Sequence, residues 1–341
     1  MHISHLGILV CPKDKTPLTV EPSSEMDGDF VRSGMLLSAA GRKYPVKAFV
    51  PRFTENDGYA ESFSVEWERH PDILHNFKTN FTAYRQRFTT ETKWDTDLTG
   101  QYILEAGCGP GAITPFALET GATVVSFDLS NSVEQARKTI GAHERSLILQ
   151  ASIFEMPFKR ETFDKVFCFG VLQHTPDPAA AMGALAEVLL SGGALAADSY
   201  IVPDPKLGGG HRLLRAKYRF RKVLPRLPPR ALHLVVSAYV SFLFPLYRRL
   251  RENPKGIEFM RSLLMDDYRQ RMTGMDEKFY REFAILDIFD FLSPKYDIPQ
   301  TVESFRKIFI DIGMLEIDVH PGWNGIEGRA VKSFVAPNGS H

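Results

Sequence analysis

Apolar and polar residues alternate along residues 101–200 in a way that predicts five short strands separated by helices. The apolar runs of strand length are residues 102–107, 123–130, 147–153, 165–172 and 192–201. Between them, residues 113–121, 133–142 and 179–190 have the length and composition of helices. Parallel strands need crossover connections that cover both faces of a sheet. We therefore expect an α/β domain with a mostly parallel sheet and helices on both faces.

The first part of the chain has a different pattern. Residues 1–53 contain short β-type runs at 6–12, 16–21, 34–38 and 44–51, with Gly and Pro between them. This pattern predicts a small β-rich module.

Residues 54–97 predict a helical approach segment to the first strand of the sheet. Tyr59, Phe63 and Trp67 follow the i, i+4, i+8 spacing that places side chains along one helix face.

The strand–helix alternation stops after Tyr200, so residues 201–292 are interpreted as a helical insertion. Residues 204–256 hold 13 Lys or Arg against Asp204 and Glu252, together with an apolar stretch at 231–247. Beyond it, residues 301–313 predict an amphipathic helix ending at Gly313, and residues 315–323 and 329–335 predict two more strands. The sheet domain is thus expected to comprise residues 98–200 and 293–338.

The composition is that of an ordinary globular protein. The chain has 341 residues, 44% of them hydrophobic and 24% charged, with 41 Lys and Arg balancing 41 Asp and Glu, so disorder, collagen and coiled coil are excluded. Three scattered cysteines form no disulfide framework, and the short apolar run at the start is not a secretory signal. We expect a cytoplasmic protein.

A glycine-rich loop follows the first strand of the sheet, with Gly107, Gly109 and Gly111 after Glu105. Glycines allow a sharp turn and let a ligand approach the backbone. The next strand ends in Asp128, about twenty residues on, where a carboxylate can accept hydrogen bonds from ribose hydroxyls. A dinucleotide site follows the same logic, but the glycine spacing disfavours a nicotinamide-dependent oxidoreductase.

Together these segments resemble the class I S-adenosylmethionine-dependent methyltransferases, whose fold is Rossmann-like. The shared motifs are Glu-x-Gly-Cys-Gly-x-Gly at 105–111, the acid at strand end 128, the segment ending in Met-Pro-Phe at 156–158, and the run from Phe163 to His174. The resemblance implies S-adenosylmethionine as cofactor. It implies these cofactor-binding residues: Glu105, Gly107, Gly109, Gly111, Asp128, Leu129, Ser152 and Ile153.

Each implied role has a simpler structural alternative. The glycines can serve helix packing, Asp128 can cap a helix, and Leu129 and Ile153 can be core residues. Ser152 stands where the family often has Asp, and serine accepts a hydrogen bond without carrying a charge.

The N-terminal module resembles the small zinc-ribbon-like domains that accompany some methyltransferases. Their metal-binding versions carry Cys-Pro-x-Cys, but here Asp14 replaces the second cysteine after Cys11, and no later cysteine pair exists. A thiolate-rich zinc site needs those ligands, so we expect a module without metal.

The acceptor side is predicted near the carboxyl ends of the strands. His174 follows the fourth strand, where an imidazole suits proton removal near neutral pH, although it can equally be a structural histidine. Tyr296 and Asp297 lie in the segment 287–301, which is expected to be a substrate-contacting loop or a solvated connector. Tyr59, Phe63 and Trp67 either cap the cofactor pocket or bury their helix.

The basic insertion allows two interpretations, a helical roof over the active site or peripheral contact of residues 204–256 with an anionic membrane. The stretch 231–247 is short for a membrane span. Balanced charge favours a small-molecule acceptor over nucleic acid, with transfer to an oxygen or nitrogen of a sugar, a lipid-linked glycan or a secondary metabolite. The alternatives are an RNA or protein methyltransferase, or a cofactor-binding scaffold without activity. The sequence does not predict the oligomeric state.

Overall fold

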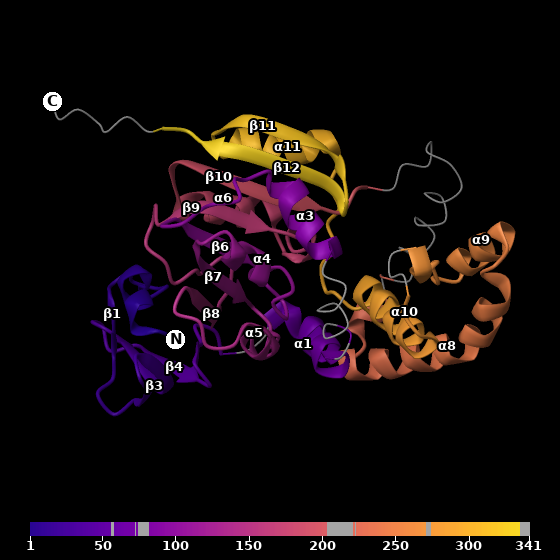
Figure 1. Ribbon diagram of the computed structural model, residues 1–341, viewed down its shortest axis with the longest axis horizontal. Helices are drawn as coiled ribbons and strands as arrows, with labels where there is room; N and C mark the ends of the chain where they lie inside the picture. The colour runs from indigo at the N-terminus through magenta and orange to yellow at the C-terminus, as the bar shows by residue number, and fades with distance from the viewer. Residues whose placement is uncertain are drawn as a thin grey trace. The chain divides into compact units, whose positions relative to one another are not determined.

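The computed structural model describes residues 1–55, 58–71, 73, 82–202, 221, 223–270 and 274–334 (Figure 1). By its internal contacts the chain divides into two compact units. Unit 1 comprises Met1–Gly58, Asn80–Val202 and Tyr296–His341, and unit 2 comprises Tyr59–Thr79 and Pro203–Lys295.

The centre of unit 1 is a seven-stranded sheet with the strand order β11-β12-β10-β9-β6-β7-β8. The strands are β6 (Tyr102–Ala106), β7 (Thr123–Asp128), β8 (Ser146–Gln150), β9 (Phe163–Cys168), β10 (Leu189–Ser199), β11 (Met314–Gly322) and β12 (Gly325–Lys332). Strands β6 to β10 pair in parallel, whereas β12 runs antiparallel to β10 and β11. The predicted mostly parallel sheet is confirmed.

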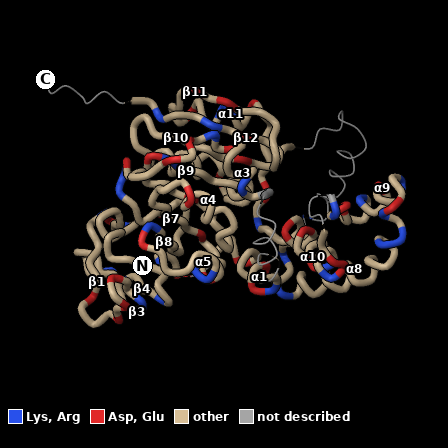
Figure 2. The backbone as a smooth tube through the Cα atoms, in the orientation of Figure 1, with Lys and Arg blue, Asp and Glu red and all other residues tan. Residues whose placement is uncertain are grey.

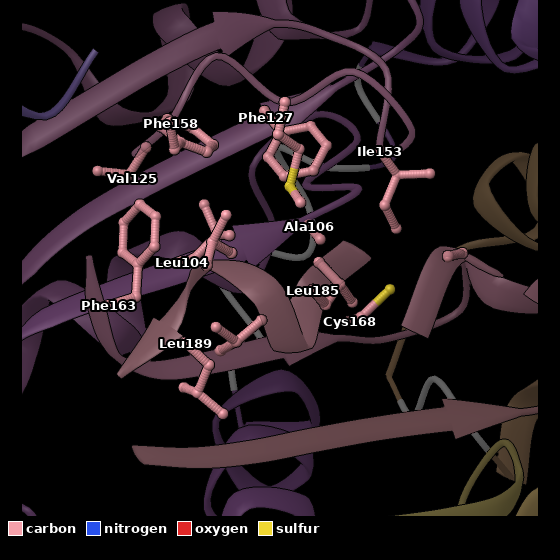
Figure 3. Close-up of a cluster of buried hydrophobic side chains, with 14 of the residues drawn as sticks. Leu104, Ala106, Val125, Phe127, Ile153, Phe158, Phe163, Cys168, Leu185 and Leu189 are labelled. Atoms are coloured by element: carbon pink, nitrogen blue, oxygen red, sulfur yellow. The ribbon is translucent and has the colours of Figure 1, made fainter. Parts of the chain in front are cut away.

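Helices cover both faces of this sheet, as the strand–helix alternation predicts. They are α3 (Thr82–Thr92), α4 (Thr114–Glu119), α5 (Val133–Ile140), α6 (Pro178–Val188) and α11 (Val302–Asp311). Successive strand residues point to opposite faces. Leu104 therefore joins the cluster that includes Leu185 of α6 and Phe305 of α11, whereas its neighbour Ile103 packs with the helices α3 and α4. Figure 3 shows part of the first cluster, where the rings of Phe127, Phe158 and Phe163 lie around Leu104 and Val125.

The N-terminal module is β-rich, as expected. An antiparallel sheet contains β1 (Leu18–Val20), β2 (Glu25–Asp27), β3 (Phe30–Ser38), β4 (Lys43–Lys47) and β5 (Val50–Pro51). The chain then passes along β8, where the Phe53 amide donates to the Gln150 carbonyl at 2.8 Å.

The strand expected at residues 6–12 is wrong, because Ile3–Ile8 form a 3-10 helix. The His2 side chain caps this helix by accepting from the Ser4 amide, and Leu9 and Val10 make only isolated bridges. A short apolar run has no period that separates a strand from a buried turn.

Unit 2 is helical, as expected for the insertion. It contains α1 (Glu61–Arg69), α8 (Pro229–Leu250), α9 (Pro254–Ser262) and α10 (Glu277–Leu292), and α1, α8 and α10 pack against one another (Figure 1). Residues 203–220 and 222, with part of the predicted basic segment, lie outside the described residues.

Two expectations for unit 2 need correction. Tyr59 lies in a 3-10 turn before α1, and Phe63 and Trp67 are half-buried, whereas the buried residues of α1 are Ser62, Val65 and Glu66. The predicted aromatic stripe is therefore not the buried face. Residues 287–292 are the end of α10 and not a loop, because nine buried residues, most of them apolar, hold this helix through Leu292.

Candidate active site

The glycine loop leaves β6 with a backbone that only glycine adopts easily. Gly107, Gly109 and Gly111 have φ angles of 76°, 50° and 81°. A Cβ atom on Gly107 would lie 2.2 Å from Cγ2 of Val171, so space as well as conformation requires glycine there. The amides of Gly107 and Cys108 donate to the Phe127 carbonyl at 2.8 and 3.0 Å, which fixes the loop to the end of β7.

Asp128 lies at the end of β7, directly beside this loop. Its Oδ2 accepts from the Gly109 amide at 2.8 Å, and its Oδ1 accepts from the amide and hydroxyl of Ser130 at 2.8 and 2.6 Å. These bonds orient the carboxylate at the carboxyl edge of the sheet. A carboxylate offers about four acceptor positions, so it can also accept from a ribose diol that shares these oxygens. The residues present therefore fit an adenosyl cofactor.

Glu105 is buried inside β6 and is hydrogen-bonded to the fold itself. The hydroxyls of Thr114 and Ser126 donate to its Oε2 at 2.6 and 2.7 Å. Burial raises the pKa of Glu105 to about 7, and the two hydroxyls oppose that rise. The side chain connects the start of α4 to the neighbouring strand.

The remaining cofactor candidates lie at the ends of β7 and β8. Leu129 is half-buried, and its carbonyl accepts from the Gln150 side chain at 2.9 Å. The Ser152 hydroxyl accepts from the Phe154 amide at 3.2 Å. Ile153 is buried in the core cluster, where Figure 3 labels it.

The structure brings His174 and Tyr296 together, although 122 positions separate them. Nδ1 of His174 lies 3.1 Å from the Tyr296 carbonyl oxygen. A carbonyl only accepts, so this contact assigns the ring proton to Nδ1 and leaves Nε2 as the basic nitrogen. Asp297 follows directly, with both carboxylate oxygens buried. The segment is held by backbone bonds from Ile298 to Gln173 and between Gln300 and Tyr200, each 2.8 Å.

Gln173 is a candidate that sequence reasoning missed. The residue is fully buried, and neither its side-chain oxygen nor its nitrogen has a hydrogen-bond partner within the described part of the chain. A buried amide without partners is costly, and such groups often face a ligand. The sequence offered one indication of this role, the position of Gln173 directly before His174 in the segment after β9.

A buried charge network was also missed. Arg87 of α3 bonds to Glu91 at 2.7 Å and to Asp198 of β10, and Asp198 accepts from the Gly170 amide at 2.5 Å. Burial and the neighbouring Asp198 raise the pKa of Glu91 to about 8. The network connects the approach helix to the turn that leads to His174.

In the N-terminal module, Cys11 and Asp14 stand at the positions of the metal-binding motif, and both side chains make contacts within the module. Sγ of Cys11 lies 3.0 Å from the Tyr44 hydroxyl, and Asp14 accepts from the Thr16 amide and hydroxyl. Among the residues that the structure describes, no three His, Cys, Asp or Glu side chains gather where they could hold a metal ion.

Comparison with known proteins shows what the central part of this domain is similar to. Residues 104–197 match the family model described as "Methyltransferase domain". The matched residues include the glycine loop and the strands β7, β8 and β9, so this part of the chain is similar to a methyltransferase domain.

Two curated relatives show how far the similarity extends. The ubiquinone biosynthesis O-methyltransferase of Pseudomonas fluorescens (strain SBW25) is 30% identical over 103 residues, 28% of this chain and 43% of the relative. The tRNA U34 carboxymethyltransferase of Vibrio parahaemolyticus is 31% identical over 147 residues, 40% of this chain and 44% of the relative. The chain thus spans less than half the length of these relatives.

A solved structure extends over more of the chain. Magnesium protoporphyrin IX methyltransferase from Synechocystis PCC 6803 covers 79% of this chain and 95% of its own, at 14% identity and a TM-score of 0.43. This similarity is too low for a functional comparison.

Proposed function

We propose that this protein is a cytoplasmic enzyme that transfers a methyl group from S-adenosylmethionine to an oxygen or nitrogen of a small molecule, such as a sugar, a lipid-linked glycan or a secondary metabolite. The observation that carries the proposal is the bond from the Gly109 amide to Asp128, because it joins the glycine loop to the acid that would hold the ribose. The three buried cysteines, all free, are compatible with a reducing cytoplasm.

Each cofactor residue has a distinct task in this proposal. Gly107, Gly109 and Gly111 leave the backbone open to the methionine and ribose part, and Asp128 accepts from the ribose hydroxyls. Leu129 and Ile153 border the adenine ring, and Ser152 accepts from its amino group. Glu105 supports the glycine loop by accepting hydrogen bonds from Thr114 and Ser126. S-adenosylmethionine, when bound, supplies an electrophilic methyl group on a sulfonium sulfur.

On the acceptor side, we propose that His174 removes the proton from the acceptor. The Tyr296 carbonyl holds Nδ1–H, so the basic Nε2 is set in one orientation for this task. Tyr296 and Asp297 contact the acceptor from the same segment, and the Gln173 amide donates to or accepts from it.

Calorimetry with S-adenosylmethionine and S-adenosylhomocysteine tests the cofactor site. We expect binding by the wild type and at least a tenfold loss for Asp128→Ala, because one charged acceptor of two hydroxyl groups is removed. Asp177→Ala is the matched control, since Asp177 caps the exposed end of α6 through the Ala180 amide. Wild-type protein that binds neither compound, while another nucleotide binds, contradicts the proposal.

Turnover with acceptor panels tests the acceptor side. We expect His174→Gln to lower kcat by about 100-fold or more with cofactor affinity unchanged. The double variant Tyr296→Phe with Asp297→Ala should raise the acceptor KM. Wild-type turnover in the double variant removes these two residues from the proposal. Cofactor binding without turnover on any acceptor favours a scaffold instead.

A nucleic-acid acceptor is the second candidate, because one relative is named for tRNA modification and residues 204–256 are rich in cations. Phosphate contacts make binding fall steeply with salt. Tight binding of labelled RNA with such a salt dependence would favour this candidate over a small molecule.

We also propose that residues 1–53 are a zinc-ribbon-like module that folds without metal. The Cys11 contact with Tyr44 and the Asp14 turn support this, because both side chains already have partners in the fold. Elemental analysis that finds stoichiometric zinc in the purified protein would contradict it.

A further inference from the structure

Helix α8 presents an apolar stripe outside its packed face. Its packed face includes Leu232, Val236, Val240 and Tyr247, which are buried in unit 2. The opposite face exposes Leu234, Val235, Phe242 and Leu246, with Phe242 at 82% exposure. These positions and Ala238 recur every three or four residues, so they form one continuous stripe. A contiguous run of exposed large apolar side chains marks an interaction surface.

Cations border this stripe. Residues 223–250 contain Arg226, Arg230, Arg248 and Arg249, all exposed, and no Asp or Glu. Arg230 pairs with Glu68 of α1 and Arg248 with Glu277 of α10, at 2.8 and 3.4 Å. Arg230 and Arg249 lie at the two ends of the stripe, about 28 Å apart along the helix. In Figure 2 the α8 tube is tan between blue segments at its ends. Long basic side chains at the ends of an apolar stripe match the headgroup layer of an anionic bilayer.

The helix is longer than its apolar stretch predicts, but its other contacts argue against a membrane span. With 22 residues, α8 has the length and composition to cross a membrane. However, Arg281 of α10 donates to Ser241 on the side of α8, and Tyr239 donates to the Leu263 carbonyl. A span would take α10, with its charged residues, into hydrocarbon. A helix lying parallel to the surface keeps α10 in water.

We propose that the exposed stripe of α8, comprising Leu234, Val235, Ala238, Phe242 and Leu246, lies on the surface of an anionic lipid bilayer, with its flanking arginines among the headgroups. This binding is peripheral and reversible, since one apolar stripe gives a modest membrane affinity. It does not depend on the proposed reaction.

Vesicle co-sedimentation of the full chain tests this proposal. We expect binding to vesicles that contain phosphatidylglycerol, weak binding to pure phosphatidylcholine, and a loss of binding as salt rises. The double variant Phe242→Ser with Leu246→Ser should weaken binding by about tenfold or more, and Arg249→Glu should reduce mainly its salt-sensitive part. Thermal unfolding of each variant should match the wild type, because the changed side chains are exposed.

The matched control is Ile310→Ser with Leu315→Ser, two exposed apolar residues of unit 1, which should bind vesicles as the wild type does. Three results would overturn the proposal. The first is no binding of the wild type to either vesicle, and the second is unchanged binding of the Phe242 and Leu246 variant. The third is a dimer in light scattering that this variant converts to a monomer without any lipid binding, which would assign the stripe to a second copy of the chain.

Discussion

Gly107 and Gly141 show how a positive φ has different consequences in different surroundings. Both have positive φ, 76° and 74°, but a Cβ on Gly107 meets Val171 whereas one on Gly141 has open space. We expect Gly141→Ala to cost about 1–3 kcal/mol of unfolding free energy from the backbone alone, because its φ of 74° and ψ of −166° lie in a region that other residues rarely adopt. Gly107→Ala should cost more and abolish cofactor binding, because the loop must move. Chemical denaturation and calorimetry measure both effects, and equal losses would contradict this account.

Glu105 should make stability depend on pH. Its pKa is about 7 in the folded chain, raised by burial from 4.5, so the folded state holds a proton that the unfolded state has released. The stabilisation from this group is full below pH 4.5 and is lost as the pH rises to about 7. Relative to Glu105→Gln, the wild type should lose up to about 1.4 kcal/mol per pH unit over that window. Parallel stability curves for the two proteins would contradict the assignment.

Sequence reasoning found the residues whose signal is local and missed those whose partners are distant. The glycines and Asp128 lie in short motifs at strand ends, where the turn itself demands the residue type. The contact between His174 and the Tyr296 carbonyl joins two segments that no spacing connects. The buried amide of Gln173 was also invisible, because burial is a property of the packed fold.

At the level of elements, Arg87 is expected to hold α3 against β10. Removing it leaves the buried Asp198 carboxylate without its cation and the buried Glu91 carboxyl group without its hydrogen-bond partner, which typically costs about 3–5 kcal/mol. Arg87→Ala should therefore lose that much unfolding free energy in urea titrations. Its neighbour Arg85, in an exposed pair with Glu119, is the control, and Arg85→Ala should lose less than about 1 kcal/mol. A small loss in both variants would show that the network is not structural.

The elements of the parallel sheet were predicted well because each strand is a buried apolar run between turn residues. The errors came where that contrast is weak. The apolar residues 3–8 fold as a 3-10 helix and not as part of a strand. The acidic residues at 287 and 290 favoured a loop there, although these residues belong to the end of α10. In both cases tertiary packing determined the secondary structure of a segment whose local sequence favoured no single conformation.

For the whole molecule, the division into two units predicts two thermal transitions. All the proposed cofactor residues belong to unit 1, the larger unit. S-adenosylhomocysteine at 100 times its dissociation constant should stabilise that unit by about 2.7 kcal/mol and leave the smaller transition in place. Asp128→Ala should remove the shift. A ligand shift confined to the smaller transition would contradict this placement in scanning calorimetry.

The edge strands of the sheet in unit 1 are β8 on one side and β11 on the other. Neither of them is a regular edge strand with all its backbone groups unpaired. Phe53 and the bridge from Arg52 to Gln150 occupy the β8 margin, while β11 carries a register shift between Leu315 and Asp318, with Glu316 at a φ of 52°. Open, regular margins invite strands from other molecules to add on and build fibres. Residues 52 and 53 at one margin and the irregular strand β11 at the other thus keep the sheet from pairing with strands of other molecules.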